Sequence, residues 1–308
     1  MAFPRSSRRM VSCATATVLL ISGTSVALTL SAPEASATGT ALFNQPFHDN
    51  TVDGSAGSVA LPAVQSGTNS ACLTAVGNAT ANPLASCTTT PTDPQGSGTL
   101  RFTSNAGGKV GAVFANGTVP TSAGLDITFN LYQWGSGASG ADGTGFVLAA
   151  ANPADPVIPS VAGPSGGSLG YSAEVSNSLS GLTDGYMAVG FDEHGNFSNP
   201  TDEGSGCTNP PNIDKTMAGQ VVLRGPGNGT VGYCALASSA ATSSSPSLTL
   251  RGTTRATAKI PVEVAINPTL SPITTSSGLA VPAGDIGFAF TPVGGSLTTE
   301  LSPLPTAA

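Results

Sequence analysis

The sequence predicts an all-β fold in which two antiparallel sheets pack face to face as a jelly-roll β sandwich. Apolar and polar residues alternate over residues 125–131 and again over residues 259–266, which is the pattern of half-buried strands. Short continuous apolar runs are typical of strands buried inside such a sandwich, and they occur at residues 145–149, 187–191, 221–223 and 286–290. Turns rich in Gly, Ser and Pro separate these segments, and no apolar stripe of helical period follows the N-terminal region.

The N-terminus has the three-part pattern of a secretory signal peptide. Arg5, Arg8 and Arg9 form a positive start, residues 11–30 carry no charge, and residues 35–37 supply the small side chains that a signal peptidase accepts. An uncleaved membrane anchor is the alternative. Because Ser and Thr dilute the apolar run and a cleavage site follows it, we expect cleavage and a secreted protein, either extracellular or at the cell surface.

Cleavage divides the chain into a signal peptide, residues 1–37, and a single domain, residues 38–308, with its core at about residues 42–301. No stretch after the signal has the roughly 20 apolar residues that a membrane span needs. The segment from residue 298 onward lacks a strand pattern, so we expect it to be an irregular end.

Cysteine usage agrees with export. Cys13 leaves with the signal, and four cysteines remain, at Cys72, Cys87, Cys207 and Cys234. An even number in an oxidising compartment favours disulfides, and four cysteines allow three pairings. Proximity in sequence favours Cys72–Cys87 and Cys207–Cys234. Metal binding is the competing interpretation, but neither pair has CxxC spacing.

Charge is sparse and acidic in balance. Charged residues make up 9% of the chain, and the net charge is −7. Lys and Arg form no cluster after the signal, so the sequence lacks the basic footprint of a nucleic-acid-binding protein. The abundance of Gly, Ser and Thr suggests disorder, but the 39% of hydrophobic residues fall in patterned runs that can build a core.

Three segments carry polar residues that strand packing does not require: residues 140–148, residues 166–171 and residues 187–197. Each has a plain structural explanation. Asp-Gly and Gly-Gly are ordinary turn sequences, and an Asp that ends a buried strand can cap the turn after it. The order of the three segments along the chain is more specific than any one of them.

Together the three segments resemble the L-type (legume-type) lectin family, in particular its bacterial secreted members. Residues 221–229 continue the likeness, which extends over about residues 42–301 and is densest in the middle. The resemblance implies a concanavalin-like jelly-roll sandwich and a function in carbohydrate binding without catalysis. Its partners would be glycans or cell-surface polysaccharide.

The resemblance also implies a carbohydrate-binding site made of Asp142, Asn196 and a backbone N–H from Gly166 or Gly167. In the family the peptide bond that matches Ala141–Asp142 is cis, which aims the Asp carboxylate at sugar hydroxyls. One charged acceptor with one or two fixed donors suits a pair of sugar hydroxyls, because charge-assisted hydrogen bonds are the stronger kind.

Calcium is the cofactor that the resemblance implies, because Ca²⁺ takes oxygen ligands from carboxylates, amides and backbone carbonyls. The matching positions are Asp192, the carbonyl of His194, Asn196 and Asp202. Asp202 lies one position further along than the family spacing, so Asn199 or Glu203 could take its place.

A transition metal is not expected. The family's Glu ligand is replaced here by Gly190, which has no side chain to ligate. The family's downstream His is also missing, because His48 and His194 are the only histidines in the sequence.

Two other functions stay open. A glycoside hydrolase on the same scaffold would need two carboxylates about 5–10 Å apart, whereas Asp192 and Glu193 are adjacent and in a strand would point to opposite faces. A Ser-His-Asp triad would need His48 or His194, and neither follows a nucleophile-elbow pattern. The second alternative is a structural or adhesive surface module without sugar affinity. We therefore expect a lectin-like protein that is not an enzyme.

Overall fold

The computed structural model describes residues 39–49, 52, 58–75, 84–88, 90, 92–137, 140–152, 154–155, 157–210, 213, 215–239 and 247–305. They belong to one unit, Ala35–Ala308, and the predicted signal peptide, residues 1–37, lies outside the described residues. Within these ranges the chain forms β-strands and short 3₁₀ turns but no α-helix, which confirms the all-β prediction. No described helix is long and apolar enough to span a membrane.

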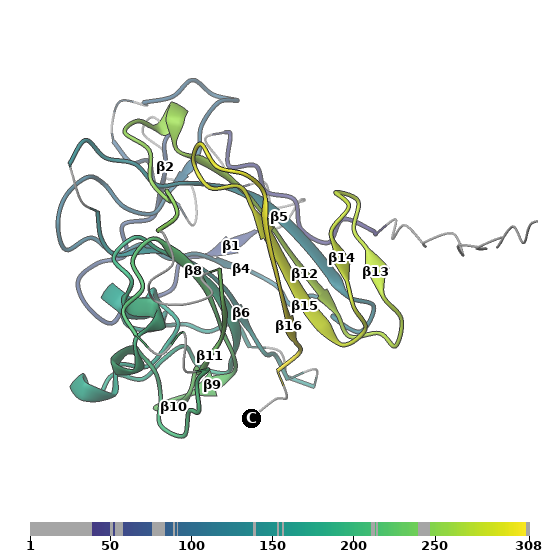
Figure 1. Ribbon diagram of the computed structural model, residues 1–308. Helices are drawn as coiled ribbons and strands as arrows, with labels where there is room; N and C mark the ends of the chain where they lie inside the picture. Colours follow the sequence, from purple (N-terminus) through teal and green to yellow (C-terminus); the bar gives the residue numbers. More distant parts are fainter. Residues whose placement is uncertain are drawn as a thin grey trace, which may run out of the picture. The chain divides into compact units, whose positions relative to one another are not determined.

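The larger sheet has six strands and is antiparallel (Figure 1). Its order is β10-β9-β7-β8-β11. β8 and β9 pair with successive parts of one edge of β7, and β6 pairs with the other edge. The strands are β6 (Gly143–Ala149), β7 (Gly185–Asp192), β8 (Gln220–Arg224), β9 (Gly227–Asn228), β10 (Val231–Gly232) and β11 (Ala235–Ser238). The central strand β7 contains the apolar run that the sequence predicts to be buried, and all but one of its residues are buried.

The smaller sheet has four antiparallel strands in the order β16-β15-β12-β5 (Figure 1). They are β5 (Leu125–Tyr132), β12 (Lys259–Asn267), β15 (Asp285–Phe290) and β16 (Thr298–Pro303). On β12, Ile260, Val262, Val264 and Ile266 share the face predicted by their alternation, and all are buried. The expectation of an irregular end from residue 298 is wrong, because β16 pairs along the whole of β15. Its backbone supplies the pairing, so it needs no apolar pattern of its own.

The two sheets share one hydrophobic core. The cluster draws on Met187, Val189 and Phe191 from β7 and on the inner face of β12 and β15. The rings of Phe191 and Phe290 meet edge to face across the sheets, with 5.7 Å between their centroids. This geometry is favourable for an aromatic pair.

A second cluster covers the other face of the larger sheet, where Ala188 and Val222 point away from the shared core. Tyr171 and Tyr233 pack there edge to face at 5.3 Å. Their hydroxyls donate to the carbonyls of Gly225 and Leu182, each at 2.8 Å. The smaller sheet thus buries one face of β7 and loops bury the other, which explains why its apolar run is continuous and does not alternate. Four of the 3₁₀ turns lie in these loops: η1 (Gly166–Ser168), η2 (Val175–Asn177), η3 (Asn196–Ser198) and η4 (Pro200–Asp202).

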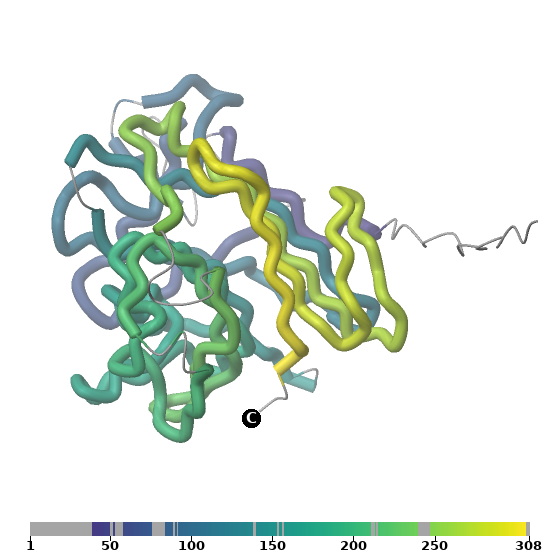
Figure 2. The backbone as a smooth tube through the Cα atoms, in the orientation of Figure 1, coloured from purple at the N-terminus to yellow at the C-terminus, as the bar shows by residue number. Residues whose placement is uncertain are grey.

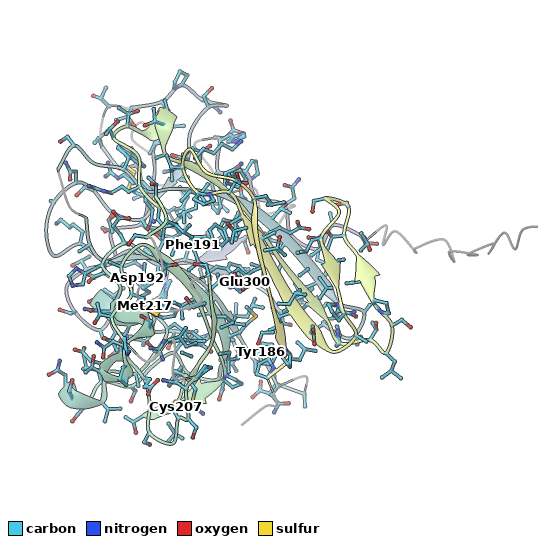
Figure 3. The ribbon with its side chains drawn as sticks, in the orientation of Figure 1. Tyr186, Phe191, Asp192, Cys207, Met217 and Glu300 are labelled. Atoms are coloured by element: carbon cyan, nitrogen blue, oxygen red, sulfur yellow. A yellow bond between two sulfur atoms is a disulfide. The ribbon has the colours of Figure 1, made fainter. Side chains whose placement is uncertain are left out.

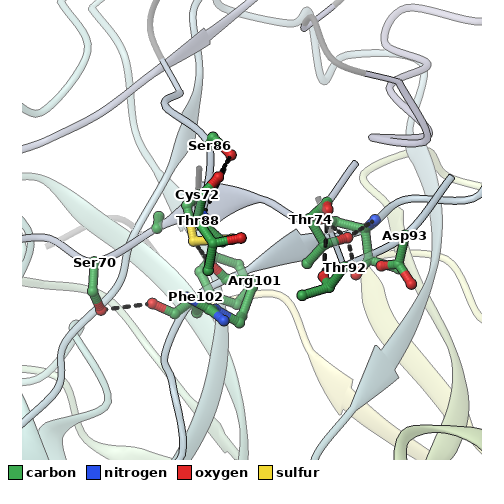
Figure 4. Close-up of a disulfide and its surroundings, with 12 residues drawn as sticks. Ser70, Cys72, Thr74, Ser86, Thr88, Thr92, Asp93, Arg101 and Phe102 are labelled. Carbon is green, nitrogen blue, oxygen red and sulfur yellow. Dashed lines mark hydrogen bonds between the residues drawn. A yellow bond between two sulfur atoms is a disulfide. The ribbon is translucent and has the colours of Figure 1, made fainter. Parts of the chain in front are cut away.

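The N-terminal part of the unit forms two small ladders. β1 (Val59–Ala60) pairs with β4 (Phe114–Ala115), and β2 (Cys72–Leu73) pairs with β3 (Leu100–Arg101). Hydrogen bonds such as Ser70 Oγ to the Phe102 carbonyl, at 2.8 Å, surround the first disulfide (Figure 4). An ion pair joins Asp93 to Arg255 of the fifth turn, η5 (Arg255–Thr257), at 2.5 Å.

Both cysteine pairings favoured by sequence proximity are confirmed. Cys72 is bonded to Cys87, and Cys207 is bonded to Cys234. Two disulfides are consistent with an oxidising compartment.

A hairpin lies on the outer face of the smaller sheet (Figure 2). It consists of β13 (Ile273–Thr274) and β14 (Ala280–Val281). Leu279 and Val281 pack on Ala265 of β12 and Ala289 of β15. At its base, the Asn267 amide nitrogen donates to three carbonyls at 2.8–3.1 Å.

The contact between the sheets can be tested with a double-mutant cycle on Phe191 and Phe290. We expect Phe290→Ala alone to cost about 3–5 kcal/mol in urea unfolding, because it leaves a cavity in the shared core. The coupling energy between Phe191→Ala and Phe290→Ala should be about 0.5–1.5 kcal/mol. Strictly additive losses would mean that the two rings do not pack against each other.

Candidate functional site

The loop after β7 is closed by the Asp192 carboxylate. Asp192 is 1% exposed, and its Oδ1 accepts the Gly195 N–H at 2.6 Å while Oδ2 accepts the Phe197 N–H. Burial raises the pKa of Asp192 to about 6, the backbone N–H groups oppose that shift, and the charge of Asp142 adds to it. Asp192, labelled in Figure 3, therefore caps the turn, as its position at a strand end suggests.

The first predicted segment meets this loop through the backbone of Asp142. Its carbonyl accepts the N–H groups of Glu193, at 2.9 Å, and His194, at 3.2 Å. The Ala141–Asp142 peptide bond is cis, as the family resemblance implies. The Asp142 carboxylate is half-buried, and among the described residues it has no hydrogen-bond or ion-pair partner.

The second predicted segment meets the same loop at Gly167. A Cβ at Gly167 would lie 2.4 Å from the Asn196 Cβ and 2.9 Å from the Asp202 carboxyl carbon, so only glycine fits there. The hydroxyl of Ser168 donates to Asp202 at 3.4 Å. The Asn196 amide is half-buried and finds no partner within the described part of the chain. Segments that are separate in sequence thus converge on residues 192–202.

The loop after β7 is held by the buried guanidinium of Arg224, a role that sequence analysis missed. Arg224 is fully buried, and its Nε donates to the Phe197 carbonyl at 2.7 Å and its Nη2 to the Asn199 carbonyl at 3.1 Å. Its Nη1 donates to the Glu203 carboxylate at 3.3 Å and also to the Tyr233 carbonyl. The one available signal was an Arg at the end of the apolar run at residues 221–223, since a buried charge needs partners.

Comparison with protein-family models, curated proteins and solved structures finds no match.

The position of the missing transition-metal ligand is filled by an aromatic ring. A Cβ at Gly190 would lie 2.2 Å from the Phe197 ring, so the larger side chain of a Glu does not fit there. The guanidinium carbon of Arg224 lies 5.0 Å from the centroid of that ring, a cation–π distance. The residues present do not suit a transition metal at this place.

The same loop offers oxygen donors of the kind that Ca²⁺ takes. Asp192, Asn196 and Asp202 lie along it, and a carboxylate oxygen that accepts one hydrogen bond keeps a further lone pair for a cation. No group of three or more His, Cys, Asp and Glu side chains is placed to hold a metal ion within the described ranges. A calcium site here would therefore depend on the Asn196 amide and on backbone oxygens such as the His194 carbonyl.

A second arginine connects the first and third segments. Arg251 forms an ion pair with Glu193 at 3.6 Å and donates to the Gly137 carbonyl at 2.6 Å. The turn before Asp142 packs against this side chain, because a Cβ at Gly140 would lie 3.0 Å from it. Arg251 thus keeps the first segment beside the loop.

We predict that Arg224→Met destabilises the protein by about 3–5 kcal/mol, because it leaves the Glu203 carboxylate and loop carbonyls buried without donors. Chemical unfolding measures the loss. Arg251→Met is the matched control, and it should cost about 1 kcal/mol or less because its ion pair is partly exposed. Equal losses in the two variants would contradict the anchoring role of Arg224.

Proposed function

We propose that this chain is a secreted, lectin-like protein that binds glycans or cell-surface polysaccharide without catalysis. The observation that carries the proposal is a pair of groups without a partner among the described residues: the Asn196 amide in the loop after β7 and the Asp142 carboxylate in the segment that contacts this loop. Other polar side chains around them, such as Asp192 and Asp202, already accept hydrogen bonds. A strong acceptor and a donor therefore remain for an external ligand.

Sugar hydroxyls match these groups chemically. A hydroxyl both donates and accepts, so a neighbouring pair can donate to Asp142 and accept from Asn196. Gly166 and Gly167 begin a 3₁₀ turn, where the first N–H groups have no partner within the turn. The Gly167 N–H is the further donor in this proposal, since Gly167 lies against Asn196.

The proposed scaffold is a concanavalin-like jelly-roll sandwich formed by the two sheets. The shared core and the Phe191–Phe290 contact support this arrangement. Secretion is supported by the N-terminal charge and apolar pattern and by the two disulfides.

We assign no catalytic role to the carboxylates at this site. A glycoside hydrolase needs two carboxyl groups that reach the scissile bond. Asp192 is buried, with both oxygens on backbone N–H groups, and Glu193 is engaged by Arg251. Asp142 alone is left for a ligand, which suits binding better than acid–base chemistry.

We also propose that the loop holds Ca²⁺ through Asp192, the His194 carbonyl, Asn196 and Asp202. Bound there, the ion would supply positive charge that orders the loop and fixes the Asn196 amide toward the ligand. The family resemblance and the oxygen-rich donor set support this assignment.

We expect Asp142→Ala and Asn196→Ala each to weaken glycan binding by at least about tenfold, because each removes one hydrogen bond to the ligand. A glycan array followed by calorimetry on the best-bound sugar measures the effect. In calcium-free buffer, thermal stability should change by no more than about 2 °C, since neither side chain has a partner among the described residues.

The matched control is Asp155→Ala, which removes an exposed carboxylate outside the site. It should bind like the parent. If the array shows no bound sugar, the alternative of a structural or adhesive module is favoured; if both site variants bind like the parent, the site is misplaced.

For calcium, we expect a chelator to weaken glycan binding by about tenfold, because the loss of one well-placed hydrogen bond from Asn196 is worth about that factor. Added Ca²⁺ should restore binding in the parent but not in Asp192→Ala. Glycan binding that is indifferent to the chelator would contradict the loop calcium while leaving the sugar site intact.

A further inference from the structure

The outer face of the smaller sheet holds a second pair of acidic residues, far in sequence from the loop site. In the register of the sheet, Asp126 of β5 lies opposite Ala265, and Thr128 lies opposite Glu263 of β12. Asp126 and Glu263 are therefore diagonal neighbours on one face, a separation that side chains can bridge. The turn of the β13–β14 hairpin reaches the same place, because the Ser277 hydroxyl donates to Glu263.

Glu263 is a buried carboxylate with one oxygen unsatisfied. The residue is 7% exposed, its Oε2 accepts from Ser277, and its Oε1 is buried without a hydrogen-bond donor. The Asp126 carboxylate is its diagonal neighbour on the same face of the sheet, and two ionised carboxylates are both acceptors. An unsatisfied buried acceptor of this kind is costly, so the site requires something positive between the two groups.

No side chain within the described ranges supplies that charge. The three ion pairs there join Arg224 to Glu203, Arg251 to Glu193 and Arg255 to Asp93, so none involves this pair.

The surrounding donors are hard oxygens. The Thr275 and Ser277 hydroxyls lie 3.1 Å apart at the hairpin turn, beside Glu263. Two carboxylates with hydroxyl groups and water make an oxygen set that Ca²⁺ accepts. The described residues at this site offer no sulfur or imidazole ligand. Asp126 is exposed at the surface, so an ion has a route in.

We propose that Asp126, Glu263 and the Ser277 hydroxyl bind a calcium ion that clamps the β13–β14 hairpin onto the outer face of the smaller sheet. Asn267 already secures the base of the hairpin through three carbonyls. The ion secures the turn at the opposite end, where Ser277 is the contact with Glu263. This site is separate from the loop site and does not depend on the proposed sugar binding.

The test is calorimetric titration of the chelator-treated full chain with CaCl₂, together with melting curves. Asp126→Asn and Glu263→Gln should each lose one equivalent of bound Ca²⁺ relative to the parent. Millimolar Ca²⁺ should raise the parent's melting temperature by on the order of 5 °C. Asp126→Asn should lose the share of that rise that belongs to this site, and without Ca²⁺ it should melt no lower than the parent because the repulsion is gone.

Asp285→Asn is the matched control, because it removes a carboxylate from β15 of the same sheet, opposite Asn267 at the C-terminal end of β12. It should keep every equivalent, and Asp126→Asn should keep the chelator sensitivity of glycan binding. An unchanged Ca²⁺ stoichiometry in Asp126→Asn overturns the proposal. A parent that binds no Ca²⁺ also overturns it.

Discussion

The site depends on one buried cation, the guanidinium of Arg224. It leaves β8 on the side of the larger sheet that faces away from the shared core, and it meets the carbonyls of Phe197 and Asn199 from below. Phe197 in turn lies against Gly190, so the ring, the guanidinium and the strand form one stack. Charge-assisted hydrogen bonds to the loop backbone thus add to the apolar packing of Phe197.

The hydrogen bonds of Arg224 to the loop determine which polar groups of the site remain without an internal partner among the described residues. Arg224 satisfies the carbonyls of Phe197 and Asn199, Asp192 satisfies the N–H groups of Gly195 and Phe197, and the Ser198 hydroxyl donates to the Gly195 carbonyl. The backbone of residues 195–199 is therefore held without the Asp142 carboxylate or the Asn196 amide. The Asn196 amide and the Asp142 carboxylate therefore remain for the proposed ligand and ion. Rigid surroundings with a few uncommitted polar groups are what a small-ligand site requires, since little ordering cost is left for binding.

Sequence was a good guide wherever the structure depends on local pattern. Alternation predicted the inner face of β12, and proximity predicted both disulfides. The family likeness implied the cis bond before Asp142, and the three segments it joined do converge. Sequence analysis did not predict strand β16, which forms through pairing with β15. It also missed the buried role of Arg224, whose hydrogen-bond partners lie 9 to 27 positions away in the sequence. Non-local partners leave no periodic trace in sequence.

Sparse charge makes each buried ionic group informative. In a chain with only 9% charged residues, a general surface field cannot offset buried carboxylates, so each needs its own local compensation. Glu203 has Arg224, and Asp192 has backbone N–H groups. Glu263 has only a hydroxyl on one oxygen and a second carboxylate near the other. Asp126 and Glu263 on the outer face of the smaller sheet therefore lack a positively charged partner. In our proposal a calcium ion from solution supplies that charge.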